Sequence, residues 1–283
     1  MFEFPEFIDI PLAVWIEWAM KWVLHNWGGF FDALGEILLR FLLWLEWGFL
    51  WVPWFVVILT VATAAWVLIR RWWAPLFMAA MMLCIGGFGY WEMAMKTLAL
   101  VTAAVVISLV IGVPTGIFMS RSDRLEMVIR PILDAMQTMP SFVYLIPVLM
   151  LFGLGKVPAL FATIVYSMPP IIRLTNVGIR EVPHDMVEAS QAFGATDWQT
   201  LLKIQLPLAR PTIVVGINQT TMMALAMVVV ASMIGAKGLG MEVLLAINRI
   251  EVGRGFEAGL SIVFLAIIID RITYALATRG KSQ

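Results

Sequence analysis

The sequence is dominated by long apolar segments, each about as long as a lipid bilayer is thick. Hydrophobic residues make up 61% of the 283-residue chain and charged residues 13%, whereas soluble domains contain about 45–50% and about 25%. A helix of about 20 apolar residues crosses the hydrocarbon core of a bilayer. We therefore predict an all-α integral membrane protein. Seven segments are expected to span the membrane: 51–69, 74–91, 94–118, 132–153, 157–174, 208–233 and 256–276.

Two of these segments, 132–153 and 157–174, contain prolines. A proline inside a helix removes one backbone hydrogen bond and kinks or breaks the helix. Such breaks are tolerated in membranes where neighbouring helices satisfy the freed backbone groups. We therefore expect these two spans to be kinked or broken at the following prolines: Pro140, Pro147, Pro158, Pro169 and Pro170.

The first fifty residues have a different pattern from the rest. Charged side chains recur every four residues, opposite tryptophan and leucine: Glu17, Lys21 and His25, then Asp32, Glu36 and Arg40. Such a stripe is typical of a helix that lies in the membrane interface. Twelve of the thirteen tryptophans precede residue 92, and tryptophan prefers the interface. Residues 1–50 are thus predicted to form interfacial amphipathic helices on the external side, one over 12–27 and one over 31–50. An eighth span over 31–50 is the alternative.

Lysine and arginine gather in alternate loops, and cytoplasmic loops carry an excess of these residues. The rich loops hold Arg70, Arg71, Arg121, Arg124, Arg130, Arg173, Arg180, Lys203, Arg210, Arg279 and Lys281. The opposite loops hold only Lys96, Lys156, Lys237, Arg249 and Arg254. We therefore expect the N-terminus outside, and the loop at 178–207 and the tail at 277–283 in the cytoplasm. The acidic start (Glu3, Glu6, Asp9) lacks the positive charge of a signal peptide.

Several kinds of site find no support in the sequence. The nearest match to a P-loop, residues 153–156, lacks the upstream glycine and has Val157 where Ser or Thr binds magnesium. We interpret this stretch as a tight turn. One cysteine, Cys84, excludes an internal disulfide, and two histidines argue against a zinc cluster. The 19 basic and 19 acidic residues give no bias toward nucleic acid. No catalytic group, metal or cofactor is expected in this chain.

The polar segment 183–207 lies between two apolar spans and predicts two short helices. Pro183 and Asp185 are typical of a helix start, and Gly194 is a natural helix end because it can adopt the left-handed conformation. Residues 196–199 form a capping box that opens the second helix. We expect Leu206 and Pro207 to end that helix before the next span.

This helical hairpin carries the residues expected to dock a soluble protein. Ala189 and Ser190 are small and let another surface approach, and Glu188 can pair across the contact. Gly194 permits the turn between the helices. An ordinary capped cytoplasmic loop is the alternative interpretation.

The spacing from Glu188 through Pro207 resembles the loop by which permease subunits of bacterial type I ABC importers contact their ATPase, with Ser190 in place of the usual second alanine. More narrowly, the chain is similar to permeases of the glycine betaine/proline betaine (osmoprotectant) family. That similarity covers about residues 92–276. It rests on residues 139–147, 169–176, 188–207, 235–240 and 255–259.

The resemblance implies the type I ABC importer permease fold in the bacterial inner membrane. It implies two permease copies, two cytoplasmic ATPases that bind ATP and Mg, and an external substrate-binding protein. Residues 51–91 then form two scaffold spans and 92–276 the permease core. ATPase coupling is expected of Glu188, Ala189, Ser190, Gly194, Ile204, Leu206 and Pro207.

The substrate implied by the resemblance is a quaternary ammonium compound such as glycine betaine or proline betaine. Aromatic faces attract such cations, so Phe142, Tyr144 and Tyr166 are candidate contacts in the substrate path, with packing between helices as the alternative. Choline, carnitine, trimethylamine oxide and dimethylsulfoniopropionate remain alternative substrates. A membrane scaffold or enzyme is the alternative class, with only Asp134 and Asp270 as acids in the spans.

Overall fold

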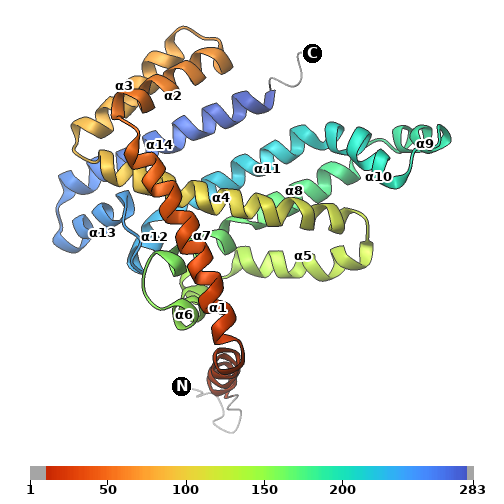
Figure 1. Cartoon of the computed structure of the whole chain (residues 1–283), viewed down its shortest axis with the longest axis horizontal. Helices are drawn as coiled ribbons and strands as arrows, with labels where there is room; N and C mark the ends of the chain where they lie inside the picture. The colour runs from red at the N-terminus through yellow and green to blue at the C-terminus, as the bar shows by residue number, and fades with distance from the viewer. Residues whose placement is uncertain (1–10, 279–283) are drawn as a thin grey trace, which may run out of the picture.

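The computed structural model describes residues 11–278, with side chains described to residue 275, and every regular element in that range is a helix (Figure 1). The predicted acidic start (Glu3, Glu6, Asp9) and the terminal Arg279 and Lys281 lie outside the described residues. So does most of the predicted tail at 277–283.

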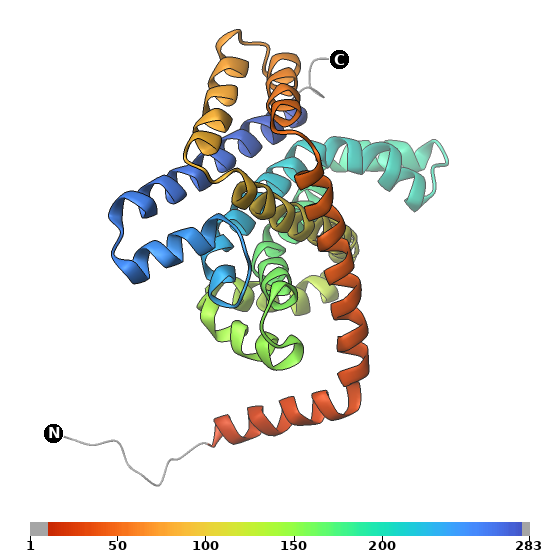
Figure 2. The same cartoon turned by 60° about the vertical axis from the view of Figure 1, so that its left-hand side comes forward.

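The N-terminal region forms one helix, α1 (Leu12–Trp51), rather than two. Its N-terminal part is bent away from the rest (Figure 2), and the remainder crosses α4 (Trp91–Ser120) steeply in both views (Figures 1 and 2). Its buried residues recur every three or four positions: Gly35, Leu38, Leu42 and Glu46. Glu46 Oε2 accepts a hydrogen bond of 2.6 Å from Lys156 Nζ, which fixes the helix to the core.

Helices α2 (Trp54–Ile69) and α3 (Trp73–Gly87) form an apolar pair that follows α1 in the chain and packs against the C-terminal helix, residues 252–278. They have 16 and 15 residues, so each is shorter than the span predicted there (51–69 and 74–91). Helix α2 is bent by 95° from α1, and the two together are long and apolar enough to form one broken span.

Close contact between α4 and α8 (Pro169–Arg180) depends on two glycines of α4. A Cβ atom at Gly116 would lie 2.7 Å from the carbonyl oxygen of Ile172, and one at Gly112 would lie 2.5 Å from Ile171 Cγ2. Small residues four positions apart let membrane helices approach closely, because the bilayer itself gives apolar side chains little reason to associate. This contact builds the centre of the helix bundle.

The segment 132–153 is broken at Pro140, as its prolines predict, and the break is sharp. The chain forms α5 (Asp123–Thr138) and α6 (Ser141–Phe152), bent by 100° at Met139-Pro140. Pro140 forces the preceding residue into an extended conformation, and Met139 has φ −69° and ψ 129°. Helix α5 is amphipathic. Its residues Asp123 and Glu126 form ion pairs with Arg180 of α8.

The predicted number of seven spans also needs correction. Four helical stretches of the described residues are long and apolar enough to cross a membrane, or up to six if each bent pair counts as one span. The four stretches are Trp91–Ser120, Lys156–Arg180, Asp197–Met233 and Val252–Ala275. The second joins α7 (Lys156–Ser167) to α8. The sequence-based prediction treated every apolar segment as a span. In the structure, some of these segments form helices that are too short or sharply bent.

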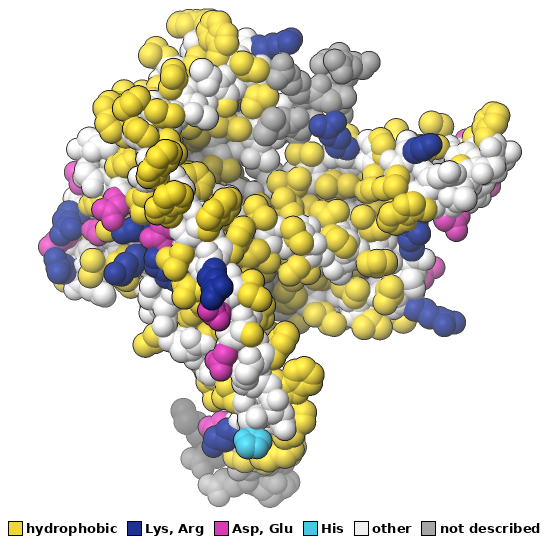
Figure 3. All heavy atoms as spheres, viewed as in Figure 1, with side chains coloured by type: hydrophobic (Ala, Val, Ile, Leu, Met, Phe, Trp, Pro, Cys, Tyr) yellow, Lys and Arg dark blue, Asp and Glu magenta, His cyan; other side chains and the backbone are white. Residues whose placement is uncertain are grey.

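The two ends of the bundle carry different structures. A helical hairpin projects at one end, while α13 (Leu239–Arg249) and α14 (Val252–Thr278) meet at the opposite end (Figure 1). Helices α11 (Leu206–Ala226) and α12 (Val228–Met233) connect them. Hydrophobic side chains cover much of the visible face, and charged side chains gather toward the two ends and along the projecting part of α1 (Figure 3). This distribution fits a molecule surrounded by lipid at its waist.

Candidate functional site: the projecting helical hairpin

The first arm of the hairpin is α9 (His184–Ala192), and Gly194 ends it as the sequence predicts. Gly194 has φ +81°. Its N–H donates to the carbonyl of Gln191 at 2.9 Å, and that of Ala195 donates to the carbonyl of Ser190 at 3.0 Å. This pair of bonds is the Schellman motif, which satisfies the last carbonyls of a helix and needs a left-handed residue. The turn direction is therefore set by Gly194.

The second arm begins with the predicted capping box. The backbone N–H of Gln199 donates to Thr196 Oγ1 at 3.3 Å, and the N–H of Thr196 donates to Gln199 Oε1 at 3.0 Å. Both bonds satisfy donors that a helix start would otherwise leave free. Helix α10 (Asp197–Thr200) thus starts at a fixed point relative to α9.

The two arms are joined by a hydrogen bond between buried hydroxyls, Ser190 Oγ and Thr200 Oγ1, at 2.9 Å. Ser190 Oγ also donates to the carbonyl of Val187 at 2.8 Å. Because a hydroxyl has only one proton to donate, Thr200 Oγ1 is the donor in the bond between the two hydroxyls. Ser190 is 7% exposed, whereas Ala189 next to it is exposed. Ser190 therefore faces the inside of the hairpin, and Ala189 remains on the outer surface.

The outer surface of the hairpin combines charge with apolar groups. Glu188 is exposed, and its Oε1 lies 3.0 Å from His184 Nδ1 one turn earlier. Phe193 is 94% exposed at the tip, and Met186 and Trp198 are also exposed. Apolar side chains this exposed outside the apolar waist are typical of a protein–protein contact surface.

Arg121, at the end of α4, contacts the second arm of the hairpin through Trp198 and Asp197. Its guanidinium carbon lies 5.8 Å from the centre of the Trp198 ring, a cation–π geometry. Its Nη2 donates to the carbonyl of Asp197 at 3.1 Å. A hollow of about 400 Å³ lies between the end of α4 and the hairpin. No sequence pattern predicts this contact, because Arg121 and Trp198 are far apart along the chain.

The expectation that Leu206 and Pro207 end the second helix is wrong. The chain continues as a π-helical turn (Leu201–Gln205) directly into α11, and the N–H of Leu206 donates to the carbonyl of Leu201. Pro207 lacks an N–H, and its ring would clash with the carbonyl four residues earlier in a regular helix. The wider π turn accommodates it. Ile204 and Leu206 are half-buried, and Pro207 is exposed at the start of α11.

Of the three aromatic candidates for the substrate path, the structure brings two together. The rings of Tyr144 (α6) and Tyr166 (α7) have centroids 6.5 Å apart, and the Tyr144 hydroxyl lies 3.9 Å from Met227 Sδ. Phe142 is separate and 52% exposed.

Two acids predicted within the spans, Asp134 and Asp270, each have a hydrogen-bond or ion-pair partner in the structure. Asp134 pairs with Arg173 at 2.6 Å, and Asp270 accepts a hydrogen bond of 2.8 Å from Asn218. The predicted tight turn is confirmed: α6 ends at Phe152 and α7 begins at Lys156. Among the described residues, no group of three or more His, Cys, Asp or Glu side chains is placed to hold a metal ion.

Comparison with known proteins gives a consistent result. Residues 108–281 match the family described as "Binding-protein-dependent transport system inner membrane component". The chain is 45% identical over 274 residues to the glycine betaine transport system permease protein OpuAB of Bacillus subtilis, covering 97% of each protein. It is 45% identical over 282 residues to the glycine betaine/carnitine transport permease protein GbuB of Listeria monocytogenes, covering 99% of this chain and 100% of GbuB.

A relative from a Gram-negative bacterium and a solved structure agree. The glycine betaine/proline betaine transport system permease protein ProW of Escherichia coli is 45% identical over 274 residues, which is 97% of this chain and 77% of ProW. A chain of the inward-facing MetNI methionine ABC transporter has a TM-score of 0.58 and 22% identity, covering 65% of this chain and 93% of that chain. At this identity the likeness concerns the fold.

Proposed function

Because the chain belongs to the family of inner-membrane permeases of binding-protein-dependent ABC importers, we propose that it carries glycine betaine and proline betaine across the membrane. It is a multi-pass membrane protein with the type I importer permease fold. The observation that carries the proposal is the 45% identity to named glycine betaine permeases along nearly the whole chain.

In this proposal the hairpin of α9 and α10 couples transport to a separate ATPase. Glu188 and Phe193 are exposed on a unit whose turn is fixed by Gly194 and whose arms are bonded together. A rigid projection with exposed apolar and charged groups can both dock and transmit motion. ATP and Mg bind to two cytoplasmic ATPase subunits, and a second copy of this chain completes the path. An external binding protein delivers the substrate at the opposite end.

The proposed topology has the N-terminus outside and the C-terminus inside. Arg121 contacts the second arm of the hairpin, Arg180 ends α8 just before the first arm, and Lys203 lies in the π turn after the second arm. An excess of such basic residues is typical of cytoplasmic loops. Residues 1–50 and 51–91 act as an interfacial anchor and scaffold around the core at 92–276. Reporter fusions after Gln283 and within 178–205 should both report cytoplasm, and a periplasmic signal from either would refute this topology.

The proposed path for the substrate passes near Tyr144 and Tyr166, whose rings lie side by side. A quaternary ammonium group is held by aromatic faces at about 0.5–2 kcal/mol per ring. In this proposal, the substrate contacts these aromatic rings only weakly as it passes. The external binding protein, rather than the path, selects the substrate.

Reconstituted vesicles test the function directly. Vesicles holding this chain and its ATPase, with the external binding protein added, should take up labelled glycine betaine only when ATP is present at the cytoplasmic face. Unlabelled proline betaine should compete. Stronger competition by choline, carnitine, trimethylamine oxide or dimethylsulfoniopropionate would reassign the substrate. Purified permease alone should not hydrolyse ATP, and robust turnover would end this proposal.

A further inference from the structure

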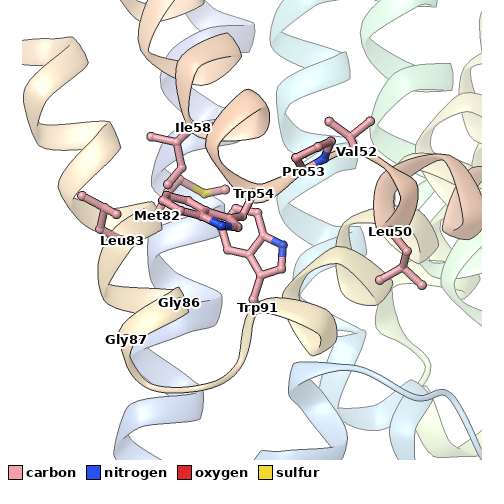
Figure 4. Close-up of a pocket in the computed structure, with 10 residues that line it drawn as sticks. All are labelled: Leu50, Val52, Pro53, Trp54, Ile58, Met82, Leu83, Gly86, Gly87 and Trp91. Carbon is pink, nitrogen blue, oxygen red and sulfur yellow. The ribbon is translucent and has the colours of Figure 1, made fainter.

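Two corners of the chain face each other across a hollow of about 520 Å³ (Figure 4). One corner is the 95° bend between α1 and α2 at Val52-Pro53, and the other is the end of α3 with the turn leading to Trp91. Gly86 and Gly87 keep the space open. A Cβ atom at Gly87 would meet no atom within 4 Å, and one at Gly86 would meet only the ring of Trp91, at 3.8 Å.

The wall of the hollow is apolar and carries no charged side chain. Leu50, Ile58, Met82 and Leu83 form it together with two tryptophans. The volume lies within the range of about 300–1,000 Å³ that is usual for sites of small ligands. A ligand of this hollow must therefore have a substantial apolar group. The lining contains no charged side chain that could form an ion pair with the ligand.

Hydrogen-bonding groups at one side of the hollow are without partners among the described residues. Trp54 and Trp91 reach toward the same region from α2 and from the start of α4 (Figure 4). Neither indole N–H makes a hydrogen bond to the described residues, although an indole N–H is a good donor. Helix α1 ends at Trp51 with no hydrogen bond capping it, so its last carbonyls present acceptors and the negative end of the helix dipole.

The opening of the hollow lies in an exposed apolar surface. Trp54 is 55% and Leu83 54% exposed, and Phe55 and Leu59 beside them are also exposed. In a multi-pass membrane protein, lipid covers such a surface. The occupant therefore has an apolar chain, acceptors for two indole N–H groups and a donor for the carbonyls that end α1. A zwitterionic phospholipid has all three, and with no Lys or Arg in the wall an anionic headgroup has no partner here.

We propose that this hollow binds one acyl chain of phosphatidylethanolamine. The ester or phosphate oxygens of the lipid accept hydrogen bonds from Trp54 and Trp91, and its ammonium group lies at the carbonyl end of α1. The lipid fills the corner between the scaffold helices and the start of α4. This site is separate from the substrate path and does not depend on the transported solute.

Photolabelling of the full chain tests the site. The protein is placed in vesicles of phosphatidylethanolamine and phosphatidylglycerol that contain traces of a phosphatidylethanolamine with a diazirine on its acyl chain. Label should concentrate on residues 50–58 and 82–91. Gly87→Leu fills the hollow without a clash, and it should lower this label about tenfold, as expected for loss of a buried apolar site. Gly259→Leu is the matched control, because a Cβ there also meets no atom within 4 Å, and its label should be unchanged.

A second variant tests the hydrogen bonds without filling the space. Trp54→Phe keeps an aromatic ring but removes the indole N–H, and it should lower labelling severalfold. Equal labelling in Gly87→Leu and the parent, or label spread evenly over Leu59, Leu76 and the other exposed apolar residues, would overturn the site. Equal labelling by a matched phosphatidylglycerol probe would overturn the headgroup assignment. The ATPase is absent from this experiment, so its result is independent of transport.

Discussion

The hydroxyl groups of Ser190 and Thr200 lie 2.9 Å apart and join the two arms of the projecting hairpin. Both residues are buried, although the hairpin as a whole projects from the bundle. A serine at position 190 is therefore a structural element of this hairpin, since an alanine would leave the Thr200 hydroxyl without this partner.

Replacement of Ser190 by alanine should weaken the hairpin by about 1 kcal/mol, the net contribution of one hydrogen bond. Amide hydrogen exchange of the full chain should become faster in α9 and α10 and stay unchanged in α4. Thr200→Ser keeps the hydroxyl and is the control, whereas Thr200→Val should act like Ser190→Ala. Unchanged exchange in both Ser190→Ala and Thr200→Val would contradict a role for this bond.

Substitution of Gly194 separates backbone conformation from space. No atom lies within 4 Å of a Cβ built at Gly194, so a larger residue meets no clash and only the φ of +81° disfavours it. Gly194→Val should cost about 1–2 kcal/mol in the turn and strongly reduce uptake, while the permease still inserts into the membrane. Gly194→Asn should retain most uptake, because asparagine tolerates the left-handed region. Equal uptake by the Val variant and the parent would mean that the turn conformation is unimportant.

Loss of the Glu188 carboxylate should weaken binding of the ATPase. A charged contact desolvated at an interface leaves its partner unpaired when one side is removed, so Glu188→Ala should lower the amount of copurifying ATPase by about tenfold. His184→Ala removes the neighbour of Glu188 and leaves the carboxylate, so it should lower the amount much less. If both variants retain the ATPase and couple normally, Glu188 does not contribute to docking.

The contact of α4 with α8 should not tolerate a methyl group at Gly116. A Cβ there would lie 2.6 Å from Thr175 Cβ and 2.7 Å from a backbone oxygen, and overpacking of this kind costs about 1–3 kcal/mol. Gly116→Ala should therefore lower the midpoint of thermal aggregation in detergent. Gly259→Ala has open space and should leave that midpoint unchanged or raise it. Equal midpoints for Gly116→Ala and the parent would show that the two helices can separate freely.

Local signals in the sequence predicted the hairpin well, because its caps are made within a few residues. Gly194 ends α9 and Thr196 opens α10, each with the expected bonds. The contacts of Ser190 with Thr200 and of Arg121 with Trp198 join residues separated along the chain. No spacing rule reports such contacts.

The spans were predicted less accurately, since hydropathy counts apolar residues without regard to direction. The segment 132–153 is apolar enough to cross a bilayer, yet Pro140 divides it into two helices bent by 100°. The amphipathic stripe in residues 12–50 correctly indicated helix, but the two predicted pieces are one helix, α1. Pro207 misled in the opposite direction, because the π turn before it lets the helix continue.

Because of that continuity, the second arm of the hairpin and the span after it form one helical stretch. The helical stretch Asp197–Met233 has 37 residues, so at 1.5 Å per residue it is about 55 Å long. A tilt of about 1° at its hairpin end therefore displaces the far end by about 1 Å for a rod of this length. Had Pro207 broken the helix, a flexible joint would absorb such a tilt. The π turn instead keeps the helical hydrogen bonding continuous from the hairpin into α11.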